Sequence, residues 1–357
     1  MAVMDDILTF EEALKDSEKY SKRHLILGNG FSIACRADIF HYGSLFSQAD
    51  FTAAQEVLSV FESLETQDFE AAIRALENAA KILPAYVKDG KNAAAKMREH
   101  ADALKEILVS TIAQNHPDRP GDISDEKYSA CRRFLSAFLH GDQGQVFTLN
   151  YDLLLYWALM HNDDALEEGF NLSTNDGFGN DEDEPDLEYV VWQGETGAHN
   201  ARVHFLHGAL HLFDSGSELK KYTWIRKGIP LVEQTRSAIS GNAYPLFVAE
   251  GTSIQKKNKI RHNAYLYQGY KQLTANIQQG KHCFFVYGHS LAENDNHILL
   301  RIARGRFPKL YVSIFGDPTS AENKWVVERA QKLTTLRTAK SPLEVTFYDA
   351  SSAEVWG

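Results

Sequence analysis

Asn150, Asp152 and His207 are polar residues that each follow closely on a short apolar run of the chain. An asparagine donates and accepts hydrogen bonds, a carboxylate accepts them, and a histidine ionises near neutral pH and can serve as a general base. Open α/β sheets hold ligands just beyond the carboxyl ends of such buried strands. The sequence therefore predicts that these side chains meet at one edge of a sheet. Simpler interpretations stay open: Asn150 or Asp152 only caps a helix, and His207 is only a core or turn histidine.

A glycine turn follows the first apolar run and reads Gly28-Asn29-Gly30-Phe31-Ser32. Paired glycines let a backbone turn sharply and approach a phosphate, and the N-terminus of a following helix offers free N–H groups. The dinucleotide-binding pattern has a third glycine where this chain has Ile33. The turn alone is therefore an incomplete nucleotide-binding signal.

A second turn, Gly288-His289-Ser290-Leu291, follows a later apolar run. It has two interpretations: a phosphate- or ribose-binding turn, or the nucleophile turn of a serine hydrolase that uses Ser290. The hydrolase pattern ends in glycine where this chain has Ala292, and it requires a histidine after the catalytic acid. Only one histidine, His297, follows Ser290 in the chain, and it lies just seven residues later. The serine hydrolase is therefore the lesser alternative.

Three histidines, His204, His207 and His211, have a spacing that suits metal ligands on a helix. At the end of a strand the same spacing scatters the side chains, because successive residues point to opposite faces. We therefore expect no metal here.

Four motifs occur in order: Gly28–Ser32, then Thr148-Leu149-Asn150-Tyr151-Asp152, then His207-Gly208, then Gly288–Leu291. Together they resemble the sirtuin-like family of NAD-consuming enzymes. The resemblance implies that Asp152 binds the nicotinamide amide, Asn150 orients a water or a ribose hydroxyl, and His207 is the general base. It also implies an NAD-binding set, with NAD as the substrate: Gly28, Asn29, Gly30, Phe31, Ser32, Thr148, Gly288 and Ser290.

The chain departs from protein-deacetylating sirtuins in its cysteines. Cys35, Cys131 and Cys283 cannot supply the four-cysteine zinc module of those enzymes, so deacetylation is disfavoured. The form of the motifs is similar to a bacterial branch without that module, whose members are typically NAD glycohydrolases of antiphage defence. Some of them act with a partner protein or as oligomers. The resemblance thus implies an NAD hydrolase, with a non-catalytic module that senses NAD or ADP-ribose as the alternative.

Apolar runs separated by helical patterns predict the fold class. The expected fold is α/β: a Rossmann-like, mostly parallel sheet with helices on both faces. Residues 45–140 carry apolar residues at helical spacing and predict a helical module inserted into a domain formed by 1–44 and 141–357. The predicted strands are 24–27, 145–149, 202–206, 245–249, 283–287, 309–315 and 343–348.

Bulk composition narrows the class of partner. A net charge of -11 disfavours general binding of nucleic acid. The run Lys256, Lys257, Lys259 and Arg261 is the clearest basic patch, and we interpret it as a solvated helix face. No basic-then-apolar leader opens the sequence, and the longest apolar run, 153–160, is too short to span a membrane. We expect a cytoplasmic protein with a polar surface loop at Asn171–Gly179 and 181–186.

Overall fold

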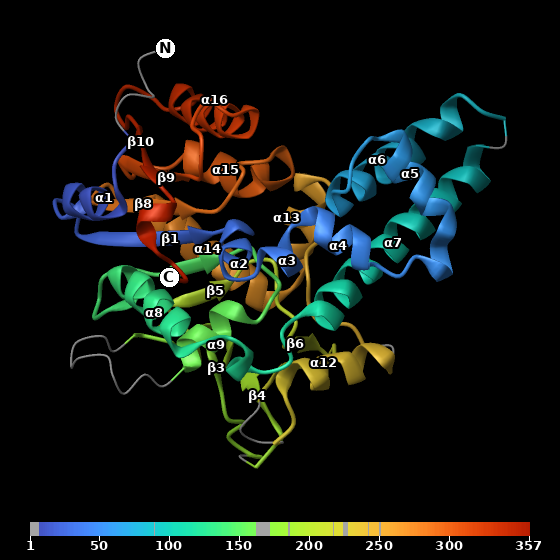
Figure 1. Ribbon diagram of the computed structural model, residues 1–357, viewed down its shortest axis with the longest axis horizontal. Coiled ribbons are helices and arrows are strands. Elements are labelled where there is room, and N and C mark those ends of the chain that lie inside the picture. The colour runs from blue at the N-terminus through green and yellow to red at the C-terminus, as the bar shows by residue number, and fades with distance from the viewer. Residues whose placement is uncertain are drawn as a thin grey trace.

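A six-stranded parallel sheet forms the centre of the molecule in the computed structural model (Figure 1). Its strand order is β10-β9-β8-β1-β2-β5, and every pairing is parallel. The chain runs outward from β1 to β5, returns to β8 beside β1, and runs outward again to β10. This is a doubly wound sheet whose direction reverses between β1 and β8, and it confirms the predicted Rossmann-like α/β class. The structure describes residues 7–88, 90–161, 172–184, 186–216, 218–223, 228–241, 243–249 and 251–357.

Six of the predicted apolar runs are the strands of this sheet. Five of these strands are buried over most of their length, as expected for parallel strands that are covered on both faces, whereas the edge strand β10 is only partly buried. Their bounds are β1 (Lys22–Leu27), β2 (Val146–Thr148), β5 (Val203–Phe205), β8 (His282–Tyr287), β9 (Lys309–Ile314) and β10 (Glu344–Asp349).

The prediction of a strand at 245–249 is wrong. This segment has one isolated bridge, between Phe247 and Gly208, and no place in the sheet. Its apolar residues are buried because the segment packs over the turn that follows β5. An apolar run can therefore be buried without being a strand, because a segment that covers a turn is also buried.

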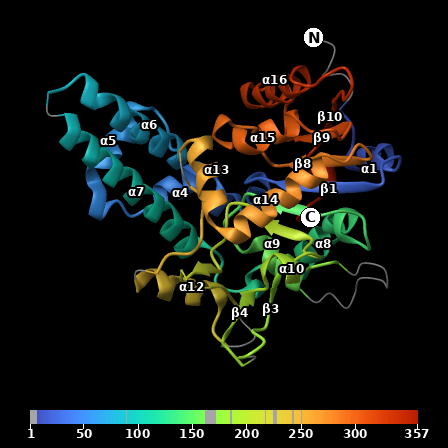
Figure 2. The same ribbon diagram turned by 180° about the vertical axis from the view of Figure 1, so that it is seen from behind.

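Helices cover both faces of the sheet, as predicted. On one face, Phe138 of α8 and Phe10 of α1 lie with ring centroids 5.3 Å and 6.1 Å from the Phe285 ring of β8. On the other face, Gly269 of α14 lies against His204 and Leu206 beside β5. Figure 1 shows α8 on the viewer's side of the sheet, and Figure 2 shows α14 on the opposite side. These helices are α1 (Phe10–Ser17), α8 (Asp125–Leu139), α14 (Ala264–Ile277), α15 (Asn296–Ala303) and α16 (Ala321–Thr335).

A helical hairpin built around α6 and α7 projects from one side of the sheet (Figures 1 and 2). Both helices lie within the predicted module 45–140, but α8, at the end of that range, packs against the sheet instead. The helical segments between β1 and α8 are α2 (Gly30–Cys35), α3 (Ala37–Phe40), α4 (Tyr42–Gln48), η1 (Thr52–Val57), α5 (Leu58–Ser63), α6 (Phe69–Ile82), η2 (Leu83–Ala85), α7 (Gly90–Asn115) and η3 (Pro120–Asp122).

A second, antiparallel sheet is formed by chain segments that follow β2 and precede α12, and its strand order is β3-β4-β7-β6. The acidic stretch of 181–186 belongs to the connection between β3 and β4, and Glu182, Asp183 and Glu184 are exposed, as expected for a surface loop. The prediction is wrong for the end of Asn171–Gly179, because Asp176 is buried in an ion pair with Lys221 and Phe178–Gly179 forms β3. Asn171 and Pro185 of the predicted loop lie outside the described residues. The bounds here are α9 (Leu154–Met160), β3 (Phe178–Gly179), β4 (Tyr189–Trp192), α10 (Gly194–Gly197), β6 (Leu212–Asp214), β7 (Leu219–Tyr222) and α12 (Leu231–Ser240).

The remaining helices follow α12 in the chain and belong to the part that forms β8, β9 and β10. They are α13 (Ser253–His262), η4 (Glu293–Asp295) and η5 (Ser351–Ala353). Among the described helices, none combines the length and the apolar character that a membrane span requires.

Replacing Phe138 by alanine should destabilise the fold. Phe138 is 0% exposed and contacts aromatic rings of α1, α8 and β8, so Phe138→Ala should lower the free energy of unfolding by about 3–5 kcal/mol in chemical denaturation. The matched control is Phe315→Ala, since Phe315 is 75% exposed and its loss should cost no more than about 0.5 kcal/mol. Equal losses would contradict the placement of the core.

Candidate functional site

The four predicted motifs meet at one edge of the parallel sheet. Leu27 of β1 is in register with Thr148 of β2 and Tyr287 of β8, and Thr148 is in register with Phe205 of β5. Because all four strands run parallel, the residues that follow them lie side by side at the carboxyl edge. This edge includes the point between β1 and β8 where doubly wound folds bind ligands.

The two glycine turns pack directly on each other at this edge. Gly30 donates its backbone N–H to the Gly288 carbonyl at 2.8 Å, and a Cβ on Gly28 would lie 2.7 Å from the same oxygen. Gly288 itself has a φ of +65°, a backbone conformation that residues other than glycine rarely adopt. These glycines are therefore required for the contact between two backbones.

Four N–H groups of the first turn, those of Gly28, Gly30, Phe31 and Ser32, already donate to protein carbonyls. Those of Phe31 and Ser32 donate to the carbonyls of Gly28 and Asn29. A phosphate bound here would have to replace protein carbonyls as the acceptor. Two side chains of the turn lie elsewhere: the Phe31 ring packs on Trp356 in the core, and Asn29 donates to the Phe40 carbonyl.

Asn150, Asp152 and Ser32 form the first polar cluster of the site. The Asn150 amide donates to Ser32 Oγ at 3.0 Å and to the Gly28 carbonyl at 3.1 Å, and Ser32 Oγ donates to Asp152 Oδ2 at 2.5 Å. Thr148 Oγ1 accepts from the Asn150 backbone N–H at 3.1 Å. The first two motifs thus meet at this edge, whereas His207 of the third motif belongs to a separate cluster.

Asp152 also has the simpler role that the sequence left open. Its Oδ1 accepts from the Leu154 backbone N–H at 2.9 Å, which stabilises the start of α9. Burial raises the pKa of Asp152, while the hydrogen bonds from Ser32 and Leu154 act in the opposite direction. The carboxyl group therefore links the start of α9 to the first glycine turn.

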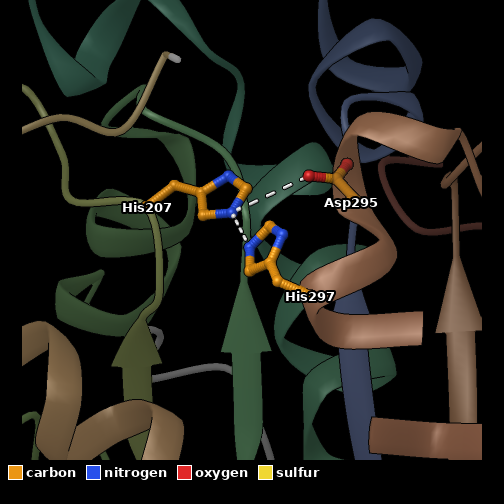
Figure 3. Close-up of side chains that lie close together, drawn as sticks. All are labelled: His207, Asp295 and His297. Carbon is orange, nitrogen blue, oxygen red and sulfur yellow. Dashed lines mark hydrogen bonds and ion pairs between the residues drawn. The ribbon is translucent and has the colours of Figure 1, made fainter. Parts of the chain in front are cut away.

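His207 belongs to a second polar cluster, with His297 and Asp295 (Figure 3). Its Nε2 shares a hydrogen bond with His297 Nε2 at 3.1 Å and lies 3.9 Å from Asp295 Oδ1. Burial lowers the pKa of His207 well below its ordinary range and that of His297 to about 4, although Asp295 acts against both shifts. Both imidazoles are therefore neutral at pH 7, so one ring donates and the other accepts.

A buried ammonium group, Lys256 of α13, holds this cluster to the helical hairpin. Lys256 Nζ lies 2.8 Å from Glu70 Oε2 of α6 and 3.1 Å from Asp295 Oδ1. Burial alone would lower the pKa of Lys256, but the two carboxyl groups raise it, so the group stays charged. The two carboxyl groups respond differently. Burial and the nearby Asp295 raise the pKa of Glu70, although Lys256 acts to lower it. For Asp295, Lys256 and the hydrogen bond from His289 outweigh burial and hold the pKa well below its usual range.

Tyr151 and His289 link the two clusters. Tyr151, between Asn150 and Asp152 in the chain, has its ring 6.3 Å from the His207 ring, and its hydroxyl donates to Glu70 at 3.1 Å. His289, whose backbone contacts the Gly28 turn, shares a hydrogen bond with Asp295 at 3.0 Å. One continuous group of polar residues therefore extends from the first glycine turn to His297.

The turn at His207 and Gly208 is hydrogen-bonded to residues 245–249, the segment that packs over it. His207 accepts at its carbonyl from the Val248 N–H at 2.9 Å, and Ala209 donates to the Leu246 carbonyl at 3.0 Å. Gly208 has a φ of +81°, and a Cβ there would overlap the Leu246 carbonyl oxygen. The glycine after His207 is thus required by both conformation and space.

A metal ion is one alternative occupant of the histidine cluster. Ligand atoms of His207, Asp295 and His297 lie within 4.8 Å of one another, a set that zinc could use. However, Asp295 Oδ1, which faces His207, already pairs with the Lys256 ammonium, and a dication beside that buried charge would be repelled. The site therefore suits hydrogen-bonded imidazoles better than a metal. As expected, the three histidines of the sequence pattern do not converge: His204 stacks on Phe147 and His211 lies against Tyr156.

Ser290 is exposed, and the geometry gives little support to a serine hydrolase. The neighbouring His289 uses Nε2 toward Asp295 and accepts from the Leu291 N–H at Nδ1, so neither ring nitrogen is left to activate Ser290.

Sequence reasoning missed the acidic and cationic partners of His207. Lys256 was assigned to a solvated face, but it is only 1% exposed; the prediction is wrong because α13 turns this residue inward together with Ile260. The shared face of residues four apart was a weak available signal. No local signal in the sequence places Glu70, which lies 186 residues before Lys256, in the site.

Comparison with known protein families gives one match. Residues 25–356 match a family described as a domain of unknown function, DUF4917. The match covers nearly the whole chain, so the chain belongs to this family. A search of curated proteins finds no match.

Removing the Lys256 charge should destabilise the fold. Lys256→Met leaves two carboxyl groups without their cation and should lower the free energy of unfolding by about 3–5 kcal/mol. The control is Lys257→Met on the same helix, a residue with no ion pair among the described residues, which should cost about 0.5 kcal/mol or less. Similar losses in urea denaturation would refute the role of the buried ammonium.

Substituting Gly208 tests the tight turn after His207. Gly208→Ala adds a Cβ that overlaps a carbonyl and also strains φ, whereas Gly216→Ala strains a φ of +84° with open space around it. Gly216→Ala should therefore cost about 1–2 kcal/mol, and Gly208→Ala clearly more. If thermal melting showed equal costs, the close approach of Leu246 would not constrain the turn.

Proposed function

We propose that this protein cleaves the bond between nicotinamide and ribose in NAD. The observation that carries the proposal is that the cluster of Asn150, Asp152 and Ser32 and the cluster of His207 lie at the same switch-point edge of a doubly wound sheet, with Tyr151 between them. Ligands bind at this edge in open α/β folds. The ordered motifs, which resemble those of sirtuin-like NAD-consuming enzymes, supply the substrate class.

The chemistry follows from the charge that develops during cleavage. Loss of nicotinamide leaves a cation on the ribose, which a water molecule must attack. In the proposed reaction Asp152 holds the nicotinamide amide, Asn150 orients the water or a ribose hydroxyl, and neutral His207 accepts a proton. The imidazolium formed on His207 would lie 3.9 Å from the Asp295 carboxylate, which favours its charge, whereas burial and the Lys256 ammonium oppose it and lower the pKa of His207.

Substrate access supports a regulated enzyme. Asn150 is 8%, Asp152 5% and His207 1% exposed, so part of the edge must open before NAD can reach them. We infer that an activating signal, a partner protein or self-association opens the site, since some members of the branch that the motifs resemble act with a partner protein or as oligomers. Action in the cytoplasm belongs to the same proposal.

A sensing module is the second candidate. It is favoured by one specific observation: the Asn150 amide donates to Ser32 and Gly28, and His207 Nε2 shares a hydrogen bond with His297, so the groups that cleavage requires are already engaged with the protein. Such a site could close on NAD or ADP-ribose without cleaving it. Calorimetry that showed tight binding without turnover would assign this function.

The direct test is release of nicotinamide from NAD, measured by chromatography, with any candidate partner present. Asn150→Ala and His207→Ala should each reduce the rate about 100-fold or more, because they remove groups that act on the reacting atoms. The control, His199→Ala, changes an exposed histidine and should leave the rate unchanged. Melting curves establish that each variant is folded. Release by the wild type that did not exceed that of Asn150→Ala would exclude the enzymatic proposal.

A further inference from the structure

A basic hollow lies between α13, α14 and α15. Its volume is about 490 Å³, and four cationic side chains line it: Lys257, Arg261, Lys271 and Arg301. The whole chain carries a net charge of -11, so this concentration of positive charge runs against the general composition. It is therefore a local feature that calls for its own physical explanation.

The cations of the basic hollow are poorly neutralised by the protein. Lys257 and Arg261 are four residues apart on α13, a spacing at which like charges repel, and neither has an ion-pair partner in the part of the chain that the structure describes. Lys271 pairs with Glu195, but these side chains are 39% and 60% exposed, so water screens the pair. An anion from outside would remove this repulsion.

Arg301 and Tyr267 complete a surface that suits phosphate and an aromatic ring, while the buried Tyr270 orients Arg301. The Arg301 guanidinium donates to the Tyr270 hydroxyl at 2.8 Å and lies 5.3 Å from the centre of its ring, which orients the planar group. Tyr267, which is partly exposed, supplies the aromatic ring of the lining. Arginine binds phosphate oxygens in pairs, and tyrosine rings stack on bases.

We propose that the basic hollow binds the phosphate groups of a small polyphosphate ligand, such as a nucleoside di- or triphosphate. Its volume lies within the range of about 300–1,000 Å³ that small-molecule sites occupy. The hollow is distinct from the candidate NAD site, because Lys256 points to Glu70 and Asp295 while the adjacent Lys257 lines the hollow. The two sites share a wall, since the Tyr270 hydroxyl donates to the His297 carbonyl at 3.0 Å.

Calorimetry of the full chain with pyrophosphate and with ATP tests this proposal. Both should bind, and the double variant Lys257→Ala, Arg261→Ala should bind at least about tenfold more weakly, because two charge-assisted contacts are lost. Affinity should fall as salt is added. The charge-matched control Lys332→Ala, Lys340→Ala removes two exposed lysines outside the hollow and should bind as the wild type does.

The outcomes separate this site from the proposed NAD chemistry. Asn150→Ala should keep full pyrophosphate binding, whether or not the protein cleaves NAD. Tighter binding of ATP than of pyrophosphate would assign a nucleotide, and equal binding would assign the phosphates alone. Absence of binding at millimolar pyrophosphate, an unchanged affinity in the Lys257→Ala, Arg261→Ala variant, or tighter binding of a single-stranded oligonucleotide would each overturn the proposal.

Discussion

The buried ammonium of Lys256 is the interaction on which the arrangement of this protein depends. It joins α13 to Glu70 of the helical hairpin and to Asp295 beyond β8, three segments that no backbone pairing connects. A buried charge is costly unless it is paired. Lys256 therefore stays buried only while Glu70 and Asp295 remain beside it. The hairpin is therefore tied to the carboxyl edge of the sheet, beside His207, by electrostatics as well as by packing.

Close backbone contact is the second constraint, and it acts on the same edge. Gly30 meets Gly288 between β1 and β8, and Gly208 meets Leu246 beyond β5. Side chains at these glycines would push the turns apart and would move Asn150, Ser32 and His207 with them. Glycines thus fix the spacing of the edge, while hydrogen bonds among the polar side chains fix their orientation. Together they keep the candidate site closed, and this closure is the physical basis for proposing that it is regulated.

Much of the fold was predictable because it depends on local patterns. Six apolar runs became parallel strands, since a strand covered on both faces must be apolar throughout. The run at 245–249 had the same composition but became a covering segment, because burial and strand pairing are separate properties. The antiparallel sheet from β3 to β7 was not expected, since its short, half-exposed strands carry no clear alternation. In the candidate site, motif order led to Asn150, Asp152 and His207, but their partners Glu70 and Lys256 could not be found in this way.

The sequence by itself determined the class of the fold, the glycines at the turns and the polar residues that follow the strands, because each depends on neighbouring residues. Only the tertiary structure decided which of these residues meet. It brought Ser32 to Asp152 and His207 to His297, and it turned Lys256 from an apparent surface residue into a buried cation. The physical reason is that such contacts join segments far apart in the chain, where the packing of whole helices, and not the pattern of neighbouring residues, sets the distances.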